Sequence, residues 1–138
     1  MMPKIPVITK FPSGAWAMLA EDFTVRVWRL EITVYRGFYF DGASIPGLLQ
    51  GLVGSPWDPL TLAAALVHDW IYASHALWKW LADLIFYALM RRYGVPRRKA
   101  IAFWWAVSRF GADAWYGHDG VDNAFARAKG SWRIITKE

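Results

Sequence analysis

The spacing of apolar residues changes once along this chain, and that change limits the fold more than any other feature. Between residues 25 and 34, apolar side chains recur at every second position, which is typical of half-buried β-strands. The apolar positions shift from odd to even numbers between Val27 and Leu30, so we expect a bulge or a tight turn there. From about Pro59 the spacing becomes helical. Strands followed by helices predict an α+β fold.

The expected elements fill a single domain over residues 1–138. We predict a β-rich part over residues 1–46, a helical part over residues 59–130 and a short strand within residues 131–136. The predicted architecture is a small N-terminal antiparallel sheet packed on an antiparallel helix pair and a third, Trp-rich helix. The helices are expected over residues 59–72, 78–93, 97–110 and 121–129, where Gly and Pro residues mark several of the ends.

The composition narrows the class of protein. Hydrophobic residues make up 56% of the chain and ten residues are Trp, which indicates a large core or an apolar face reserved for a partner or a membrane. No uncharged run reaches the ~20 residues that a membrane-spanning helix needs, and the N-terminal sequence does not resemble a secretory signal. We therefore expect a protein that is not transmembrane, with peripheral membrane contact left open.

The charged residues and the lack of cysteine further limit the class of protein. The chain has no cysteine, which excludes a disulfide scaffold and a thiolate metal site. The net charge is +5. The main basic cluster could contact nucleic acid, an anionic membrane or an acidic protein surface, and we favour a solvated helix end with the loop after it. This cluster consists of Arg91, Arg92, Arg97, Arg98 and Lys99.

Ionisable side chains gather in one stretch of this apolar sequence: His68, Asp69 and Tyr72, with Asp83 beyond a short connection. Such groups destabilise a core unless they are paired or used. His68 and Asp83 lie about equally far from the centre of residues 74–77, roughly 10 Å along each helix. Antiparallel packing would bring His68 or Asp69 opposite Asp83, with Tyr72 on the same face as His68. The spacing predicts a His–Asp pair with a Tyr hydroxyl near the carboxylate.

Such a pair has a catalytic and a structural interpretation. A carboxylate that accepts a hydrogen bond from one imidazole nitrogen raises the basicity of the other, which would prepare His68 as a base for water with Asp83 and Tyr72 behind it. In the structural interpretation, the same residues form a satisfied buried network that rigidifies the helix pair and catalyses nothing.

A second motif, Phe40-Asp41-Gly42-Ala43-Ser44-Ile45-Pro46, precedes the helices. Asp-Gly is a turn signal, and Pro46 favours an extended conformation at Ile45, so the motif can be a turn without further function. If this turn faces the helix pair, Asp41 with Asp69 could bind a hard divalent cation such as calcium, with Ser44 as a supporting ligand or hydrogen-bond donor.

Five segments with a characteristic order carry a family resemblance: ITV and GF within residues 32–38, FDGASIP, ALVHDWIY, ADLIF with LM and GV, and V-x-RFG. In this order they resemble a family of small phage- and prophage-encoded proteins classed as a domain of unknown function. The resemblance covers roughly residues 22–111 and implies a bacteriophage origin without an established activity. Members commonly carry a basic residue a few positions before the Ala-Asp pair. This chain departs from that pattern with Trp78, Lys79 and Trp80 in the stretch, where Lys79 could substitute for the basic residue but not for a fixed guanidinium.

The His-Asp-x-x-Tyr helix opposed by an Asp-bearing helix is also similar to the active-site helix pair of secreted phospholipases A2. That resemblance implies His68 as the water-activating base, Asp69 as a calcium ligand, Asp83 as the partner of His68 and Tyr72 as its support. The disulfides of those enzymes are absent here, and their glycine-rich calcium loop has no clear match, although residues 41–44 could occupy the same place.

We therefore expect a bacteriophage accessory protein with a hydrolase-like His–Asp site, with or without metal assistance, that acts on a cell-envelope component, either lipid or peptidoglycan. The alternative is a non-catalytic virion protein of a tail or neck, and a third option is a host-directed binding protein. The expected partners are other phage proteins or the host envelope, and not nucleic acid. The expected location is the virion or the infected host cytoplasm.

Overall fold

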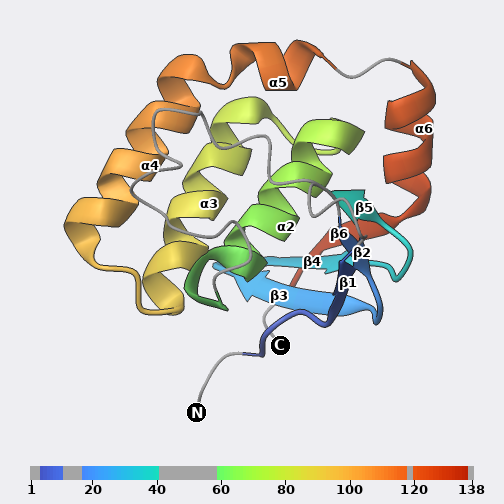
Figure 1. The fold of residues 1–138 in the computed structure, drawn as a ribbon, viewed down its shortest axis with the longest axis horizontal. Coiled ribbons are helices and arrows are strands. Elements are labelled where there is room, and N and C mark those ends of the chain that lie inside the picture. The colour runs from blue at the N-terminus through green and yellow to red at the C-terminus, as the bar shows by residue number, and fades with distance from the viewer. Residues whose placement is uncertain (1–3, 11–16, 41–58, 118–119, 137–138) are drawn as a thin grey trace.

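The computed structural model of the chain describes residues 4–10, 17–40, 59–117 and 120–136. Over these residues the fold is α+β, as predicted, with two three-stranded antiparallel sheets and a set of packed helices (Figure 1). The strands are β1 (Ile8–Lys10), β2 (Ala17–Leu19), β3 (Phe23–Val27), β4 (Leu30–Val34), β5 (Tyr39–Phe40) and β6 (Gly130–Ile134). The helices are α2 (Pro59–Ser74), α3 (Lys79–Arg92), α4 (Arg97–Phe110), α5 (Ala112–Tyr116) and α6 (Gly120–Ala128).

Helix α2 is the centre of the molecule. Every residue from Thr61 to Ser74 is buried, which suits a helix that is apolar around most of its circumference. Helix α3 packs along α2, α4 packs on the other side of α3, and α6 covers a further side of α2 (Figure 1). Strands β4 and β5 also contact α2. The ionisable residues of α2 are thus enclosed by other elements rather than displayed on a surface.

The two sheets are β1-β2-β5 and β3-β4-β6. A two-residue turn at Trp28 and Arg29 joins β3 to β4, with Val27 paired to Leu30. Trp28 has a φ of 54°, a left-handed conformation that tight hairpin turns require. This turn accounts for the shift in apolar positions between Val27 and Leu30 and confirms the tight turn predicted there.

The third strand of the second sheet comes from the far end of the chain. Strand β6 pairs antiparallel with β4, with Val34 opposite Gly130. A Cβ atom at Gly130 would lie 2.3 Å from the indole of Trp70, so only glycine lets the strand approach α2 this closely. The same indole donates a hydrogen bond of 2.7 Å to the Ala126 carbonyl at the end of α6. Trp70 therefore fixes both α6 and β6 against the central helix.

The observed elements lie close to the predicted ranges. Helix α4 has the predicted bounds, while α2 extends two residues further, to Ser74. Two features were not predicted: the division of the strands into two sheets, and α5, which has only five residues and is too short for a clear helical period. Among the helices that the structure describes, none has both the length and the apolar character needed to cross a bilayer.

Candidate active site

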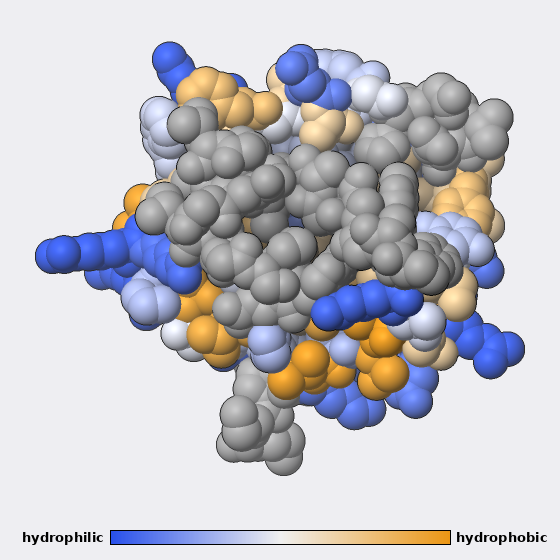
Figure 2. Space-filling model, in the orientation of Figure 1, coloured by the Kyte–Doolittle hydropathy of each residue, from blue (hydrophilic) through white to orange (hydrophobic). Residues whose placement is uncertain are grey.

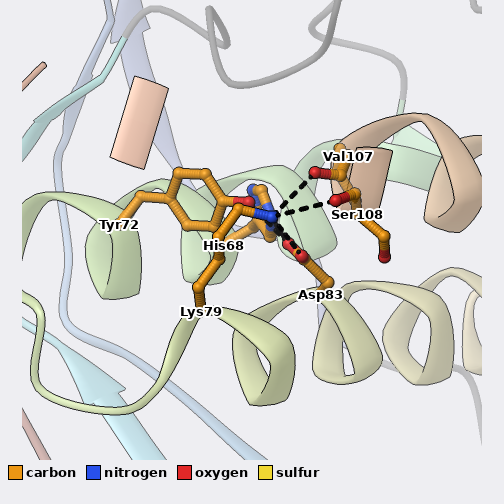
Figure 3. Close-up of polar contacts among 6 residues, drawn as sticks. All are labelled: His68, Tyr72, Lys79, Asp83, Val107 and Ser108. Atoms are coloured by element: carbon orange, nitrogen blue, oxygen red, sulfur yellow. Dashed lines mark hydrogen bonds and ion pairs between the residues drawn. The ribbon is translucent and has the colours of Figure 1, made fainter. Parts of the chain in front are cut away.

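The predicted meeting of α2 and α3 is observed at the level of His68. His68 and Tyr72 extend from α2 toward α3, which contributes Asp83 and Lys79 (Figure 3). The His68 Nε2 atom lies 2.8 Å from Asp83 Oδ1, and the Tyr72 hydroxyl donates a 2.7 Å hydrogen bond to the same oxygen. Residues that are four apart on α2 thus converge on one carboxylate of the neighbouring helix, as i and i+4 positions permit.

The Asp83 carboxylate is buried, with 1% of the residue exposed, and accepts three hydrogen bonds. Its second oxygen accepts a bond of 2.9 Å from Lys79 Nζ. Burial acts to raise the pKa of Asp83, but the hydrogen bonds from His68, Tyr72 and Lys79 outweigh it and leave the pKa below its usual value. The group is therefore a carboxylate at neutral pH, and it accepts at both oxygens.

Because Asp83 is an acceptor, His68 holds its proton on Nε2 and donates it to Oδ1. Its other nitrogen, Nδ1, then carries a lone pair, is buried, and has no hydrogen-bond partner in the part of the chain that the structure describes. Burial lowers the pKa of His68, against the opposing effect of Asp83, and the charge of Lys79 lowers it further. The imidazole is therefore neutral near pH 7, with an unprotonated, buried Nδ1.

Aromatic rings surround the imidazole. The Tyr72 ring centroid lies 4.1 Å from that of His68, and the Phe86 centroid lies 4.7 Å away on the α3 side. These apolar neighbours keep the local dielectric low, which strengthens the interaction between His68 and Asp83. Burial also raises the pKa of Tyr72 well above its usual value, so its hydroxyl remains a donor.

Lys79 connects the site to a third helix. Besides Asp83, its ammonium donates to the Val107 carbonyl at 3.0 Å and the Ser108 carbonyl at 3.4 Å, near the C-terminus of α4 (Figure 3). Helix C-termini carry unpaired carbonyls and a partial negative charge, so an ammonium is favourable there. In the sequence, Lys79 was only a candidate substitute for the basic residue of the similar family, and its contact with α4 was not predicted.

Gly111 is a second residue of the site that the site prediction missed. A Cβ atom there would lie 2.6 Å from the Tyr72 hydroxyl and 2.3 Å from the Val107 carbonyl oxygen. Only a residue without a side chain leaves room for the hydroxyl to reach Asp83. Its position in the Arg109-Phe110-Gly111 motif was the available signal, although a glycine after a helix is first interpreted as a stop.

The sequence-predicted site residues fall into three groups. His68, Tyr72 and Asp83 are brought together as their spacing predicted, and their catalytic roles stay predictions. Asp69 is 8% exposed, beside His68 on α2 but not part of the contacts with Asp83. The proposed cation ligand Asp41 and its support Ser44 lie outside the described residues.

The described residues do not test the predicted cation site, because Asp41 lies outside them. Asp69 supplies oxygen ligands of the type that calcium prefers. Within the described ranges, however, no three His, Asp or Glu side chains are grouped as metal ligands. A cation at Asp69 and Asp41 therefore stays a prediction.

Comparison with known proteins places the chain in a family. Residues 17–107 match the model for the family described as "Protein of unknown function (DUF1353)". The chain belongs to this family. The match includes His68, Tyr72, Lys79 and Asp83, so the side chains that donate to Asp83 all lie inside the DUF1353 region, whereas Ser108 and Gly111 lie just beyond it.

Two relatives of this DUF1353 chain come from Sinorhizobium fredii. The uncharacterized protein y4iH is 44% identical over 72 residues, which are 51% of this chain and 30% of the relative. The uncharacterized protein y4jT is 36% identical over 84 residues, 61% of this chain and 25% of the relative. The chain thus matches less than a third of the length of either curated relative. No solved structure matches the chain.

Proposed function

We propose that this protein is a bacteriophage accessory hydrolase that uses His68 as a general base on a cell-envelope component. The observation that carries the proposal is the buried Nδ1 of His68, which has no partner among the described residues while Nε2 is bonded to Asp83. Buried polar atoms are nearly always hydrogen-bonded, and a catalytic role is one of the recognised reasons for an exception. A neutral imidazole oriented by a carboxylate is the arrangement that general-base catalysis uses.

The reaction follows from the positions of the protons. The Nδ1 lone pair accepts a proton from a water molecule while the water oxygen attacks the carbonyl carbon of an ester or amide. The resulting imidazolium keeps its Nε2 proton and donates a hydrogen bond through it to the Asp83 carboxylate, whose negative charge stabilises the positive charge. The bond to the leaving group then breaks, and the leaving group takes the proton from Nδ1.

Tyr72 and Lys79 act as positioning residues. Both donate to Asp83 and hold the carboxylate level with His68. Their bonds also keep Asp83 deprotonated, so it can accept from Nε2. A carboxylate that became protonated would lose its preference for that tautomer and leave Nδ1 without a defined lone pair.

The test is hydrolysis of phospholipid vesicles and of purified peptidoglycan by the full chain and by His68→Gln and Asp83→Asn, below the melting temperature of every variant. We expect both variants to lose at least a hundredfold in kcat/KM. The parent value should also fall on acidification with an inflection below pH 6.5, because burial lowers the pKa of His68 and the base must be neutral. Asp113→Asn, at an exposed carboxylate on α5, is the matched control.

Two results would overturn the proposal. One is a parent protein that hydrolyses neither substrate. The other is a demonstrated hydrolysis that survives in folded His68→Gln, since a general base cannot be replaced by an amide.

The second candidate function is a non-catalytic virion protein of a tail or neck, favoured by one specific observation. His68 has no exposed surface, so substrate meets it only if the protein opens locally. In that case the three bonds to Asp83 serve stability alone. The expected result is that His68→Ala lowers the melting temperature strongly and that the protein copurifies with phage particles.

A further inference from the structure

An open pocket of about 340 Å³ lies where α2 ends and α3 begins. It is separate from the buried His–Asp pair, and it draws residues from distant parts of the chain, because α5 and β6 complete its wall. The pocket is lined by His75, Ala76, Leu77, Trp78, Trp115 and Trp132. At roughly 30 Å³ for each molecule of liquid water, the pocket has room for roughly ten water-sized groups.

The lining is apolar and aromatic. None of the six described lining residues carries a carboxylate, an ammonium or a guanidinium. Half of them are Trp, and the residues Trp78 and Trp132 remain 67% and 41% exposed. On the face that Figure 2 shows, the coloured residues are hydrophobic and hydrophilic groups interspersed. A concave site with such a wall suits a ligand that buries CH₂ groups.

The polar atoms of the wall are few, and one is already used. His75 Nε2 donates to the Trp115 carbonyl at 2.8 Å, and the two rings stack with centroids 3.9 Å apart. His75 also has a φ of 53°, an uncommon conformation for a residue with a side chain. A saccharide would need many more donors and acceptors than this wall offers, so the lining favours an acyl chain over a glycan.

Trp115 connects the pocket to the candidate active site. Its ring meets the Tyr72 ring edge to face, with centroids 5.2 Å apart, and Tyr72 donates to Asp83. A ligand in the pocket would therefore lie one aromatic ring away from the residues that position His68. His68 itself has no exposed surface, so a substrate bound in the pocket would reach the His–Asp pair only after a local opening of the protein.

We propose that this pocket binds an acyl chain of an anionic phospholipid, which makes the envelope substrate a lipid and in this respect rests on the proposed function. Exposed Trp side chains are favoured at the boundary between lipid and water, because the indole is apolar with one polar N–H. The net charge of +5 complements an anionic bilayer surface. The size of the pocket, its uncharged wall and its exposed indoles all fit this ligand.

The first probe is 11-(dansylamino)undecanoate, titrated by fluorescence against the full chain. We expect saturable binding of one probe per chain, with a Kd at least tenfold weaker in Ala76→Trp, which fills the pocket, and in a Trp78→Ala, Trp132→Ala double variant. Trp28→Ala is the matched control, because Trp28 is 60% exposed but does not line the pocket. Two different pocket variants protect the test against loss of folding in either one.

The second probe is flotation with phosphatidylglycerol or phosphatidylcholine vesicles. We expect binding to the anionic vesicles that the pocket variants weaken and Trp28→Ala does not. Equal probe binding in parent and pocket variants would overturn the proposal. So would vesicle binding that the pocket variants retain, which would indicate adsorption by basic residues alone, or pocket-dependent binding to peptidoglycan instead of lipid.

The same variants distinguish this proposal from the proposed function. His68→Gln is expected to bind the undecanoate probe as the parent does. If the parent binds the probe in the pocket but hydrolyses nothing, the acyl-chain site stands and the general-base role of His68 is wrong. If hydrolysis depends on His68 but no pocket variant changes probe binding, the general-base role of His68 stands and the acyl-chain site is wrong.

Discussion

Among the described residues, the carboxylates of Asp83 and Glu31 both accept hydrogen bonds from basic side chains, and their surroundings differ. Asp83 lies between α2 and α3 with 1% of the residue exposed and accepts from His68, Tyr72 and Lys79. Glu31 lies on β4 and accepts from Arg26 at 2.8 Å and Arg133 at 2.7 Å, whose side chains are 67% and 68% exposed. Both carboxyl groups have a lowered pKa.

The difference shows that a similar set of bonds has different consequences inside and outside a core. At Glu31 the hydrogen bonds from Arg133 and Arg26 lower the pKa, but water surrounds the arginines and would solvate the carboxylate if they were removed. At Asp83 water cannot replace a lost partner, so every group that faces the carboxylate depends on it. The buried network is therefore sensitive to single changes, whereas the cross-strand ion pairs tolerate them.

The largest expected effect is that of Asp83→Asn. Removing the charge leaves Lys79 near an uncharged amide and reduces the bonds from His68 and Tyr72. Breaking a buried ion pair costs about 3–5 kcal/mol of unfolding free energy. Urea unfolding followed by circular dichroism measures it. A loss no larger than that of Glu31→Gln would remove the contrast between the two carboxylates.

Next in size is the loss of the Tyr72 hydroxyl. Tyr72→Phe is expected to lower the unfolding free energy by about 1.5–3 kcal/mol, because the bond runs to a buried charge. Gly111→Ala should cost about 1–3 kcal/mol by crowding the same hydroxyl and the Val107 carbonyl. The double variant should lose less unfolding free energy than the sum of the two single losses, because Tyr72→Phe removes one of the clashes. Strict additivity would show that Gly111 does not act through Tyr72.

The pH dependence of stability tests the buried network around Asp83 through the protonation of His68. Because the pKa of His68 is lowered in the folded protein, the unfolded chain binds a proton more readily below pH 6.5, and acidification favours unfolding. One proton gives a slope of up to about 1.4 kcal/mol per pH unit. Urea unfolding between pH 7.5 and 5.5 should show this loss in the parent but a smaller one in His68→Gln. Equal slopes would mean that His68 is not held neutral.

The smallest expected effect is that of Glu31→Gln. The arginines that this change releases are mostly exposed and remain solvated. We therefore expect the melting temperature to fall by less than it does in Asp83→Asn. Salt at about 1 M should remove most of this difference by screening. Calorimetry at low and high salt measures both quantities. A loss that does not change with salt would show that the ion pairs of Glu31 are shielded from solvent, as those of Asp83 are.

Much of the helical part could be predicted because its signals are local. Helix α4 begins after Pro96 and ends before Gly111, and both ends are visible in the sequence. That His68 and Asp83 lie at the same height along the paired helices could also be predicted, because it depends only on the helix rise and on the short connection between the helices. Helix α5 and the pairing of β6 with β4 could not, because five residues show no clear period and strand partners distant in sequence leave no local signal.

The sequence by itself determined which faces of α2 and α3 carry ionisable groups, because side-chain direction along a helix depends only on position within it. The tertiary structure decided that His68 rather than Asp69 meets Asp83, and that the ammonium of Lys79 reaches the end of α4. It also decided that Trp132 of β6 and Trp78 beside α3 line one pocket. These contacts join elements far apart in the chain, and packing of whole elements, not local periodicity, sets the distance between them.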